Sequence, residues 1–374
     1  MDKNVRDLIY LLKCAVDSET PDKDKVSAMD LEALYKLSRK HSLSAAAATA
    51  LSSAGIEDLK FVQAYTQAIR KQVMLDAECR RIIGEFEKHG IWYMPLKGYL
   101  LKNLYPAAGI REMADIDILF DKEKHDELRE MMIADGYTPE NKEKNHHDAF
   151  MKPPVMNFEM HTDLFSHHAN EKLLSYYKDF GRFLIKNEDG GYGRHFSDND
   201  FYVYITAHEY NHFNASGIGI RPFMDSYVFM REKGKGLDWD YITKQLELTG
   251  MTKHEKQRRE IADKLFTSYG EAELTPEEEE FFERFISSGT YGNTHSRVRN
   301  AIDKLDTDGK KHSKFYYLRR RLFPDLDHMR KHFPQFFRHK ATIPFAYVFR
   351  IYRAVFRKRG RIGVELEEIN KKVK

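Results

Sequence analysis

The sequence predicts an α+β fold, in which a short mixed sheet is flanked by N- and C-terminal helical regions. Apolar residues recur at helical spacing up to about residue 88 and again from about residue 171. Between these regions, short apolar runs alternate with turns and charged helical segments, which is typical of a compact mixed unit. We therefore expect four regions: helical over 1–88, sheet-containing over 89–170, helical over 171–310, and a basic helical tail over 311–374.

The first region is expected to be helical throughout. Its three segments LIYLLKCAV, MDLEALYKLSRKHSLSAAAATALSSAG and the long run from Leu59 to His89 have apolar residues at helical spacing. Gly55 and Gly90 are the expected helix ends, because glycine readily takes the left-handed conformation that closes a helix.

The second region is expected to alternate strands and helices. The predicted order is a strand (91–95), the turn Lys97-Gly98, a short helix ended by Pro106, a strand (113–120), a charged helix (122–136) and a strand (155–161). From about residue 171 the helical pattern returns, and Thr275 is the expected N-cap of the segment TPEEEEFFERFISSG.

Composition limits the class of protein. Hydrophobic residues make up 41% of the 374 residues, which is enough for a substantial core. Cys14 and Cys79 are too few for a disulfide framework or a cysteine metal site. The N-terminus lacks a signal-peptide core, and no window approaches the roughly 18 apolar residues of a membrane span. The sequence therefore predicts a soluble, cytoplasmic protein.

The net charge of +3 is unevenly distributed. From Lys311 to the end, 18 Lys and Arg stand against 5 Asp and Glu, so the tail carries +13 and residues 1–310 carry −10. Residues 345–361 interleave aromatic and aliphatic residues with arginines. Such a helix either contacts an anionic surface or packs its aromatic residues on its own protein and leaves the arginines in water.

Asp115 and Asp117 occur in the apolar run REMADIDILF. If both residues are in a strand, alternation places the two carboxylates on one face and Ile116, Ile118 and Phe120 on the other. Neighbouring carboxylates repel unless a positive charge lies between them, and Mg²⁺ prefers one or two carboxylates plus substrate phosphates. The alternative is a strand end whose acidic residues face solvent.

The surrounding residues favour the metal site. Lys97-Gly98 follows one predicted strand and opens a helix, where glycine allows close approach of a phosphate and lysine supplies a positive charge. Glu159 adds a third carboxylate on a later strand, and His161 shares its face. A carboxylate there can act as a metal ligand or as the base for a hydroxyl nucleophile.

The segment MPLKGYLLKNLYPAAGIREMADIDILF resembles the signature of the uncharacterised nucleotidyltransferase family, in which LKG is followed by LYP and then by R-x-x-x-D-I-D. Phe158-Glu159-Met160-His161 is similar to the Glu-x-His strand of that family. The family belongs to the DNA polymerase β-like superfamily, so the resemblance implies a polymerase β-like nucleotidyltransferase core over 89–170, with residues 171–310 shaping an acceptor cleft.

The resemblance also implies a reaction, in which an acceptor hydroxyl attacks an NTP, receives its NMP and releases pyrophosphate. Asp115, Asp117 and Glu159 would be the catalytic metal ligands for Mg²⁺ (or Mn²⁺). The residues implied to bind the nucleotide are Lys97, Gly98, Arg111 and His161. The acceptor is left open among a sugar, another small molecule, a protein and an RNA.

The chain departs from the wider superfamily at the phosphate turn. Many members have Gly-Ser or Gly-Gly there, whereas this chain has Lys97-Gly98-Tyr99. The alternative function is therefore a nucleotide-binding or regulatory module that catalyses little or no transfer.

Other polar residues suggest weaker alternatives. His208-Glu209-Tyr210-Asn211-His212 fits the zinc-hydrolase pattern H-E-x-x-H, but no third ligand stands out downstream. Arg221 and Asp225, four residues apart on a predicted helix, form either an exposed ion pair or part of the acceptor cleft. His208 and His212 are either structural residues or cleft residues that face the substrate, with zinc binding as the alternative. The pairs His146-His147 and His167-His168 are expected in exposed loops.

Overall fold

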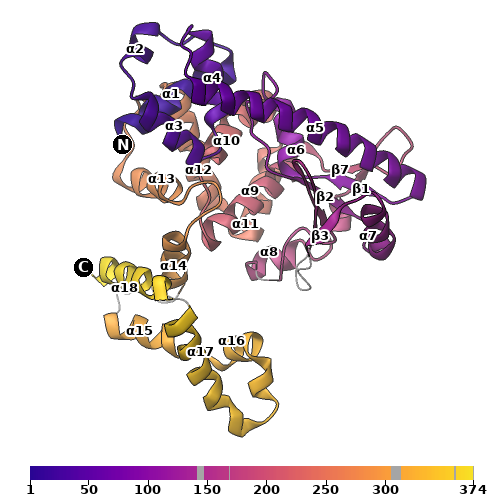
Figure 1. Ribbon diagram of the computed structural model, residues 1–374, viewed down its shortest axis with the longest axis vertical. Helices are drawn as coiled ribbons and strands as arrows, with labels where there is room; N and C mark the ends of the chain where they lie inside the picture. The colour runs from indigo at the N-terminus through magenta and orange to yellow at the C-terminus, as the bar shows by residue number, and fades with distance from the viewer. Residues whose placement is uncertain (141–146, 168, 305–312, 358, 374) are drawn as a thin grey trace. The chain divides into compact units, whose positions relative to one another are not determined.

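The computed structural model describes the chain except for residues 141–146, 168, 305–312, 358 and 374 (Figure 1). The chain divides into two compact units, and we describe each by itself. The first comprises residues 1–211 and 220–283, and the second comprises residues 212–219 and 284–374.

The first unit begins with five helices, in the part of the chain where the sequence predicts three helical segments. They are α1 (Lys3–Asp17), α2 (Lys23–Ser27), α3 (Leu31–Lys40), α4 (Ser44–Ser53) and α5 (Leu59–His89). Asp58 caps α5 by accepting hydrogen bonds from the first-turn amides. Gly90, at φ 64°, ends the helix in the left-handed conformation, so the predicted bounds of this long helix are confirmed.

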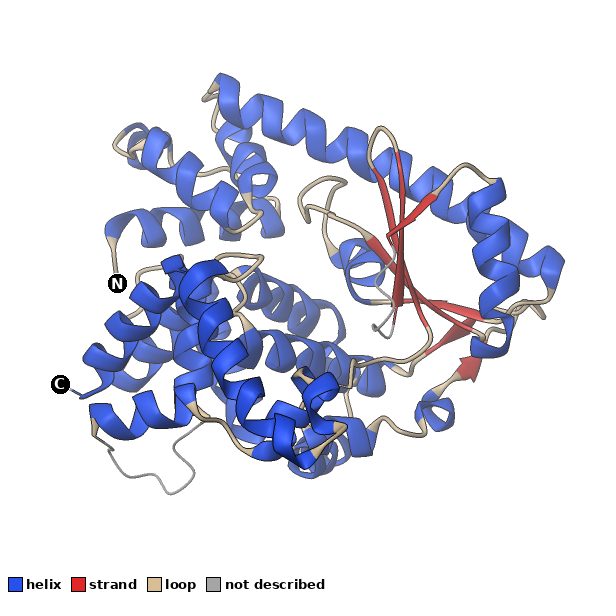
Figure 2. Ribbon diagram, turned by 60° about the horizontal axis from the view of Figure 1, so that its bottom comes forward, coloured by secondary structure: helices blue, strands red, loops and turns tan. Residues whose placement is uncertain are grey.

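A five-stranded mixed sheet follows α5 (Figure 2). Its strands are β1 (Tyr93–Pro95), β2 (Ile116–Phe120), β3 (Thr138–Glu140), β4 (His147–Lys152) and β5 (Met156–His161). Their order is β1-β2-β5-β4-β3, and among these strands only β2 and β5 run parallel to each other. A separate hairpin pairs β6 (Ile185–Lys186) with β7 (Arg194–His195).

Two details of the sheet differ from the prediction. The strand predicted over 113–120 begins only at Ile116, so Asp115 precedes the strand instead of lying in it. His147, predicted in an exposed loop, is the first residue of β4 and is partly buried, because β4 pairs with β5 along its whole length. His146 and His168 lie outside the described residues, and His167 is exposed in a loop as predicted.

Short helical segments connect the strands. They are α6 (Lys97–Leu101), the 3₁₀ turns η1 (Lys102–Leu104) and η2 (Lys122–Lys124), and α7 (His125–Ala134). One face of the sheet packs on α5 and α7 in a core that contains Ile116, Ile118 and Phe120 from β2. Burying three such side chains contributes about 1.5–3 kcal/mol each, so this face fixes the orientation of the strand.

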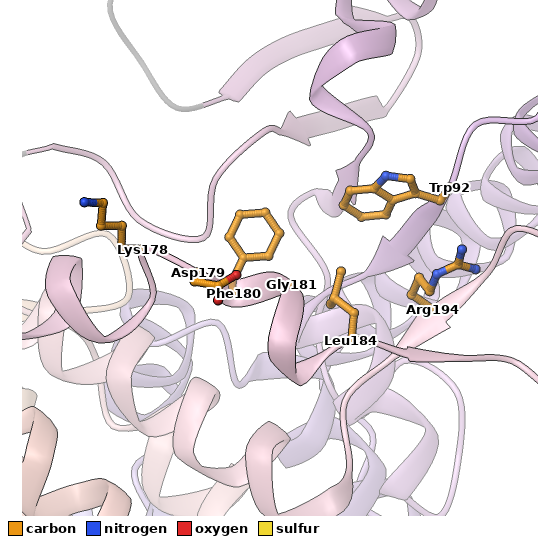
Figure 3. Close-up of a pocket in the computed structure, with 7 residues that line it drawn as sticks. All are labelled: Trp92, Lys178, Asp179, Phe180, Gly181, Leu184 and Arg194. Atoms are coloured by element: carbon orange, nitrogen blue, oxygen red, sulfur yellow. The ribbon is translucent and has the colours of Figure 1, made fainter.

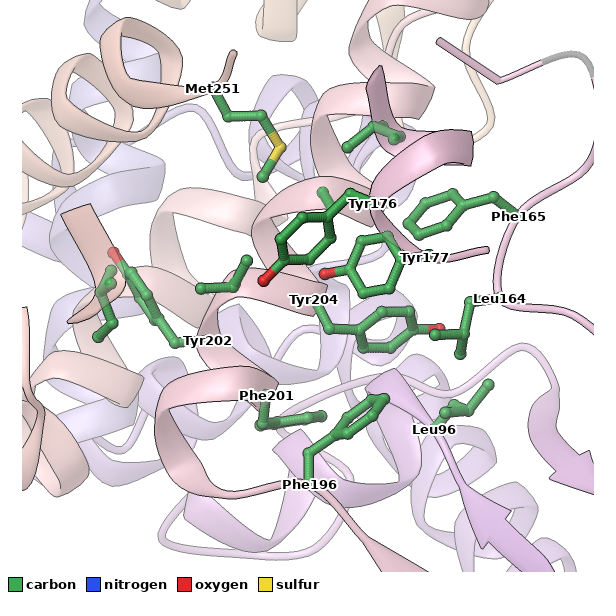
Figure 4. Close-up of a cluster of buried hydrophobic side chains, with 14 of the residues drawn as sticks. Leu96, Leu164, Phe165, Tyr176, Tyr177, Phe196, Phe201, Tyr202, Tyr204 and Met251 are labelled. Atoms are coloured by element: carbon green, nitrogen blue, oxygen red, sulfur yellow. The ribbon is translucent and has the colours of Figure 1, made fainter. Parts of the chain in front are cut away.

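The opposite face packs on residues of α8 (Glu171–Tyr176), the turn η3 (Phe180–Phe183), α9 (Asp198–Ala215), α10 (Arg221–Lys233) and α11 (Trp239–Thr249). The turn η4 (Gly234–Gly236) lies between α10 and α11, and α12 (Thr252–Thr267) and α13 (Pro276–Ser288) follow α11. Figure 4 shows the aromatic core on this side, where Tyr176, Tyr177 and Tyr204 lie together near Leu96. Thr275 and Glu278 exchange hydrogen bonds at the start of α13, which confirms the predicted cap.

The second unit is helical. It contains α14 (Thr294–Asp303), α15 (Lys314–Leu322), α16 (Leu326–His332), the turns η5 (Pro334–Phe337) and η6 (Lys340–Thr342), α17 (Ile343–Arg357) and α18 (Arg359–Val373). Helix α17 exposes the side chains of Phe345, Val348, Phe349 and Tyr352, with exposures from 38% to 65%. Within the described residues, no helix combines the length and apolar character that crossing a membrane requires.

Candidate functional site

Strand register places four potential ligand side chains on one face of the sheet. Asp117 in β2 pairs with Glu159 in β5, and His161 in β5 pairs with His147 in β4. Side chains at alternate positions of a strand share a face, and paired residues on adjacent strands point the same way. The face opposite Ile116 and its neighbours therefore carries two carboxylates and two imidazoles.

Asp117 is the centre of this group. One of its oxygens, Oδ1, lies 2.8 Å from Lys97 Nζ and 2.8 Å from His161 Nε2. Burial alone would raise the pKa of this carboxyl, but Lys97 and His161 outweigh burial and hold the pKa well below its usual range. In the structure, the positive charge beside the aspartate pair therefore comes from these two side chains.

Glu159 lies next to Asp117 and faces both histidines. Its Oε2 atom is 3.6 Å from His161 Nε2 and 3.5 Å from His147 Nε2. The rings of the two histidines are 4.9 Å apart between centroids. Burial disfavours the protonated form of His161, but its hydrogen bond to Asp117 and the nearby carboxylate of Glu159 more than compensate and raise its pKa.

Asp115 lies beside this group, directly before β2. Burial raises the pKa of Asp115 to about 6, and the negative charges of Asp117 and Glu159 add to the rise. A cation bound beside Asp115 would favour its charged form and so lower this pKa.

Lys97 is positioned by the turn between β1 and α6. It is the first residue of α6 and has φ 43°, a left-handed conformation that is uncommon for a residue with a side chain. The next residue, Gly98, packs against Arg111: a Cβ atom there would lie 2.7 Å from Arg111 Nη1. The Lys97-Gly98 turn thus depends on a residue without a side chain at its second position.

Arg111 is engaged by a partner far away in the sequence. Its Nε and Nη2 atoms donate to the two oxygens of Asp225 in α10, at 2.7 and 2.9 Å, and the Tyr105 hydroxyl donates to the same carboxylate at 2.5 Å. Burial raises the pKa of Asp225, but Arg111 outweighs burial and the pKa lies below its usual range. The ion pair between Asp225 and Arg111 joins α10 to the loop before β2. Arg221, which is also in α10, donates to the Glu112 carbonyl of the same loop at 3.3 Å.

The H-E-x-x-H segment lies on α9, and its glutamate is already paired. Glu209 is buried, with its two oxygens 2.9 Å from His254 Nε2 and 3.2 Å from Arg258 Nε. Among the described residues, the groups of three side chains close enough to hold a metal include neither His208 nor His212. The structure therefore offers no support for the zinc-hydrolase alternative.

Sequence reasoning missed two residues near the carboxylates. His147 was expected in a loop, and only the pairing of β4 with β5 brings it to Glu159. Tyr204 of α9 is fully buried, its hydroxyl has no hydrogen-bond partner in the described part of the chain, and the negative charge of Asp117 contributes to raising its pKa. In the sequence, Tyr204 lies in a helical segment rich in aromatic residues, which indicates only that it belongs to the core.

A surface pocket lies elsewhere on the first unit (Figure 3). It is lined by Trp92, Lys178, Asp179, Phe180, Gly181, Leu184 and Arg194. The carbonyl of Trp92 accepts from the amide of Asp121, at the end of β2 opposite to Asp117. Four residues of strand separate these points by roughly 13 Å, so the pocket is not the carboxylate site.

The fold and the site together define a class of protein. Two carboxylates side by side on a parallel strand pair, next to a lysine-glycine turn, suit a phosphoryl- or nucleotidyl-transfer centre. A sequence model of the family described as "Uncharacterised nucleotidyltransferase" matches residues 27–267, which is more than half of the chain. The chain therefore belongs to this family and is a transferase of the nucleotidyltransferase class. No curated protein and no solved structure matches the chain.

Proposed function

We propose that the protein transfers an NMP from an NTP to an acceptor hydroxyl in a reaction that depends on Mg²⁺ or Mn²⁺. The observation that carries the proposal is the pairing of Asp117 with Glu159 across β2 and β5, with Asp115 and Lys97 beside them. This pairing supports the polymerase β-like arrangement that the motif implies.

The residues present offer the ligand chemistry of a divalent cation, although the carboxylate oxygens of Asp115, Asp117 and Glu159 do not all lie within 4.8 Å of one another in the structure. Carboxylate oxygens are the ligands that Mg²⁺ and Mn²⁺ prefer, and Asp115, Asp117 and Glu159 provide three of them on adjacent backbone segments. Burial raises the pKa of Asp115, the charges of Asp117 and Glu159 add to the rise, and a cation would relieve this repulsion. When bound, such an ion would polarise the triphosphate and neutralise charge that develops on its oxygens.

The chain's own groups have separate roles in the proposed reaction. Lys97 and the backbone at Gly98 would bind the triphosphate, and Glu159, where it is not a metal ligand, would accept the proton of the attacking hydroxyl. A bond forms between the acceptor oxygen and the α-phosphorus, and the bond to the pyrophosphate leaving group breaks. We assign Arg111 and His161 as positioning residues, because Arg111 packs on Gly98 and His161 donates to Asp117.

The test is a pyrophosphate-release assay with each labelled NTP, Mg²⁺ or Mn²⁺ and a cell extract as the source of acceptor. We expect release and a labelled acceptor with the natural chain and loss of both with Asp117→Asn. The matched control is Asp121→Asn, which removes a carboxylate just after the same strand and outside the site. Equal activity of the two variants would contradict the proposal.

The second candidate is a nucleotide-binding module without turnover. It is favoured by the contact between Lys97 and Asp117, which uses the same lysine and carboxylate that transfer would require, and by Tyr99 at the phosphate turn. Calorimetric binding of an NTP that depends on Asp117, without pyrophosphate release from any acceptor, would select this candidate.

We further propose that the basic C-terminal region contacts an anionic bilayer surface. Two facts support this choice over packing of the aromatic residues on the chain itself: Phe345 and Val348 are 62% and 65% exposed, and the region from Lys311 carries +13. Apolar side chains and cations on one helix suit an anionic lipid interface.

A further inference from the structure

We infer that His147, Glu159 and His161 form a binding site for a tetrahedrally coordinated transition-metal ion of the Zn²⁺ type, which Mg²⁺ does not fill. The inference deepens the proposed function, since Glu159 belongs to both. The metal site needs only these three side chains, so the inference can be correct even if the protein does not transfer a nucleotide.

The backbone brings the three ligands together. His161 and His147 are direct partners in the antiparallel pair of β5 and β4, and Glu159 precedes His161 by two positions on the same strand. All three therefore project from the same face, and their ligand atoms lie within 4.8 Å of one another. Rigid strands hold such a constellation more accurately than loops do.

The two distances from Glu159 to the histidines fit a tetrahedral ion. Zinc bonds of about 2.0–2.1 Å in tetrahedral geometry require neighbouring ligand atoms to be about 3.3–3.4 Å apart. The Oε2 atom of Glu159 lies 3.5 Å from His147 Nε2 and 3.6 Å from His161 Nε2. Octahedral Mg²⁺, at about 2.1 Å, would require about 3.0 Å between neighbouring ligands.

The donor atoms also discriminate between metals. Imidazole nitrogen suits zinc, copper, iron and nickel, whereas Mg²⁺ takes oxygen ligands and releases its water reluctantly. Two imidazoles and one carboxylate leave one tetrahedral position open, the composition of several catalytic zinc sites. An ion held this way makes Glu159 a metal ligand, so Glu159 would not act as the base that accepts the hydroxyl proton.

The neighbours are compatible with a cation here. Lys97 contacts Asp117, not Glu159, and an ion at His161 Nε2 would take the place of the proton that this nitrogen now donates to Asp117 Oδ1 at 2.8 Å. The other group of three such side chains among the described residues already has a lysine ammonium beside its carboxylates. It consists of His295, Glu367 and Glu368, and the Nζ atom of Lys371 lies 2.8 and 3.0 Å from the two glutamates and neutralises them.

The experiment is equilibrium dialysis of the full chain, stripped with a chelator, against Zn²⁺ in a large excess of Mg²⁺, followed by elemental analysis. We expect one Zn²⁺ per chain and at least a tenfold weaker affinity in both His147→Ala and His147→Gln. His89→Ala is the matched control, because it removes a partly exposed histidine outside the site. Far-ultraviolet circular dichroism checks that each variant is folded.

A second measurement does not depend on any variant. Co²⁺ bound to the natural chain should give the intense visible absorption of a four-coordinate ion, and Zn²⁺ should abolish it by displacement. Absence of this spectrum, or zinc binding that His147→Ala and His89→Ala change equally, would overturn the inference.

The outcomes separate the two proposals. Pyrophosphate release with Mg²⁺ but without stoichiometric Zn²⁺ binding would overturn the metal-site inference and leave the proposed function. Stoichiometric Zn²⁺ binding through His147, without release from any NTP, would support the inference and reject the proposed function.

Discussion

Removing the carboxylate of Asp225 should destabilise the first unit strongly. In Asp225→Ala, the guanidinium of Arg111, whose side chain is only 6% exposed, keeps its charge and loses two hydrogen bonds of 2.7 and 2.9 Å. The Tyr105 hydroxyl loses its partner as well. Removing one member of a buried ion pair costs about 3–5 kcal/mol, mainly because the remaining charge is uncompensated. We therefore expect this decrease in the free energy of unfolding at pH 7.

The assay is urea unfolding followed by circular dichroism, analysed by linear extrapolation. The control is Lys233→Ala on the same helix, which breaks the 3.0 Å pair with Asp198 between side chains that are 40% and 54% exposed. An exposed pair contributes about 0–1 kcal/mol. The double variant Arg111→Met/Asp225→Leu should recover much of the loss, because neither charge then remains buried.

A loss below about 1 kcal/mol in Asp225→Ala, equal to that in the Lys233→Ala control, would refute this reasoning. It would mean that water or another group satisfies Arg111 without its partner. Arg111 would then be available for the triphosphate, as the family motif suggests.

Three further predictions follow from other contacts. Gly98→Ala should lower the free energy of unfolding by about 1–3 kcal/mol, because its Cβ would lie 2.7 Å from Arg111 Nη1, and a thermal melt measures this; an unchanged midpoint would show that the turn adapts. Burial lowers the pKa of His41 to about 3, so only the unfolded chain gains its proton as the pH falls below about 6.5. As the pH falls from about 6.5 towards about 3, His41 should therefore lower the free energy of unfolding by up to roughly 1.4 kcal/mol per pH unit, and above about pH 6.5 it should have no effect. Urea unfolding at several pH values should show that this free energy depends less steeply on pH in His41→Gln, and parallel curves for the two proteins would contradict the prediction. Phe345→Ser should weaken sedimentation of the protein with phosphatidylglycerol vesicles without changing the thermal midpoint, because the side chain is 62% exposed; equal sedimentation of both forms would exclude this helix as the contact.

The elements with a long or strict sequence pattern were predictable. Helix α5 has helical spacing over its whole length and glycine at its end, so both of its bounds follow from the sequence. Strand β5 alternates Phe158 and Met160 with Glu159 and His161, which indicates both the strand and the face of the carboxylate.

The remaining features depend on contacts between distant segments. Strand β4 reads HDAFMK, in which the apolar residues Ala149, Phe150 and Met151 are consecutive and do not alternate with polar ones, so the strand is recognised only through its pairing with β5. The four-residue spacing of Arg221 and Asp225 suggested a pair within one helix. The structure instead pairs Asp225 with Arg111, which lies 114 positions away in the sequence. Local propensity contains no information on such tertiary partners.

The contact between Lys97 and Asp117 has a thermodynamic consequence for the proposed reaction. The lysine neutralises the aspartate at 2.8 Å, so a metal ion that binds to Asp117 must compete with an ammonium group of the same chain. A triphosphate that attracts Lys97 would remove this competitor, and by linkage each ligand must then raise the affinity of the other by the same factor. The chain would hold its metal weakly until the nucleotide arrives, and Lys97→Met would uncouple the two binding equilibria.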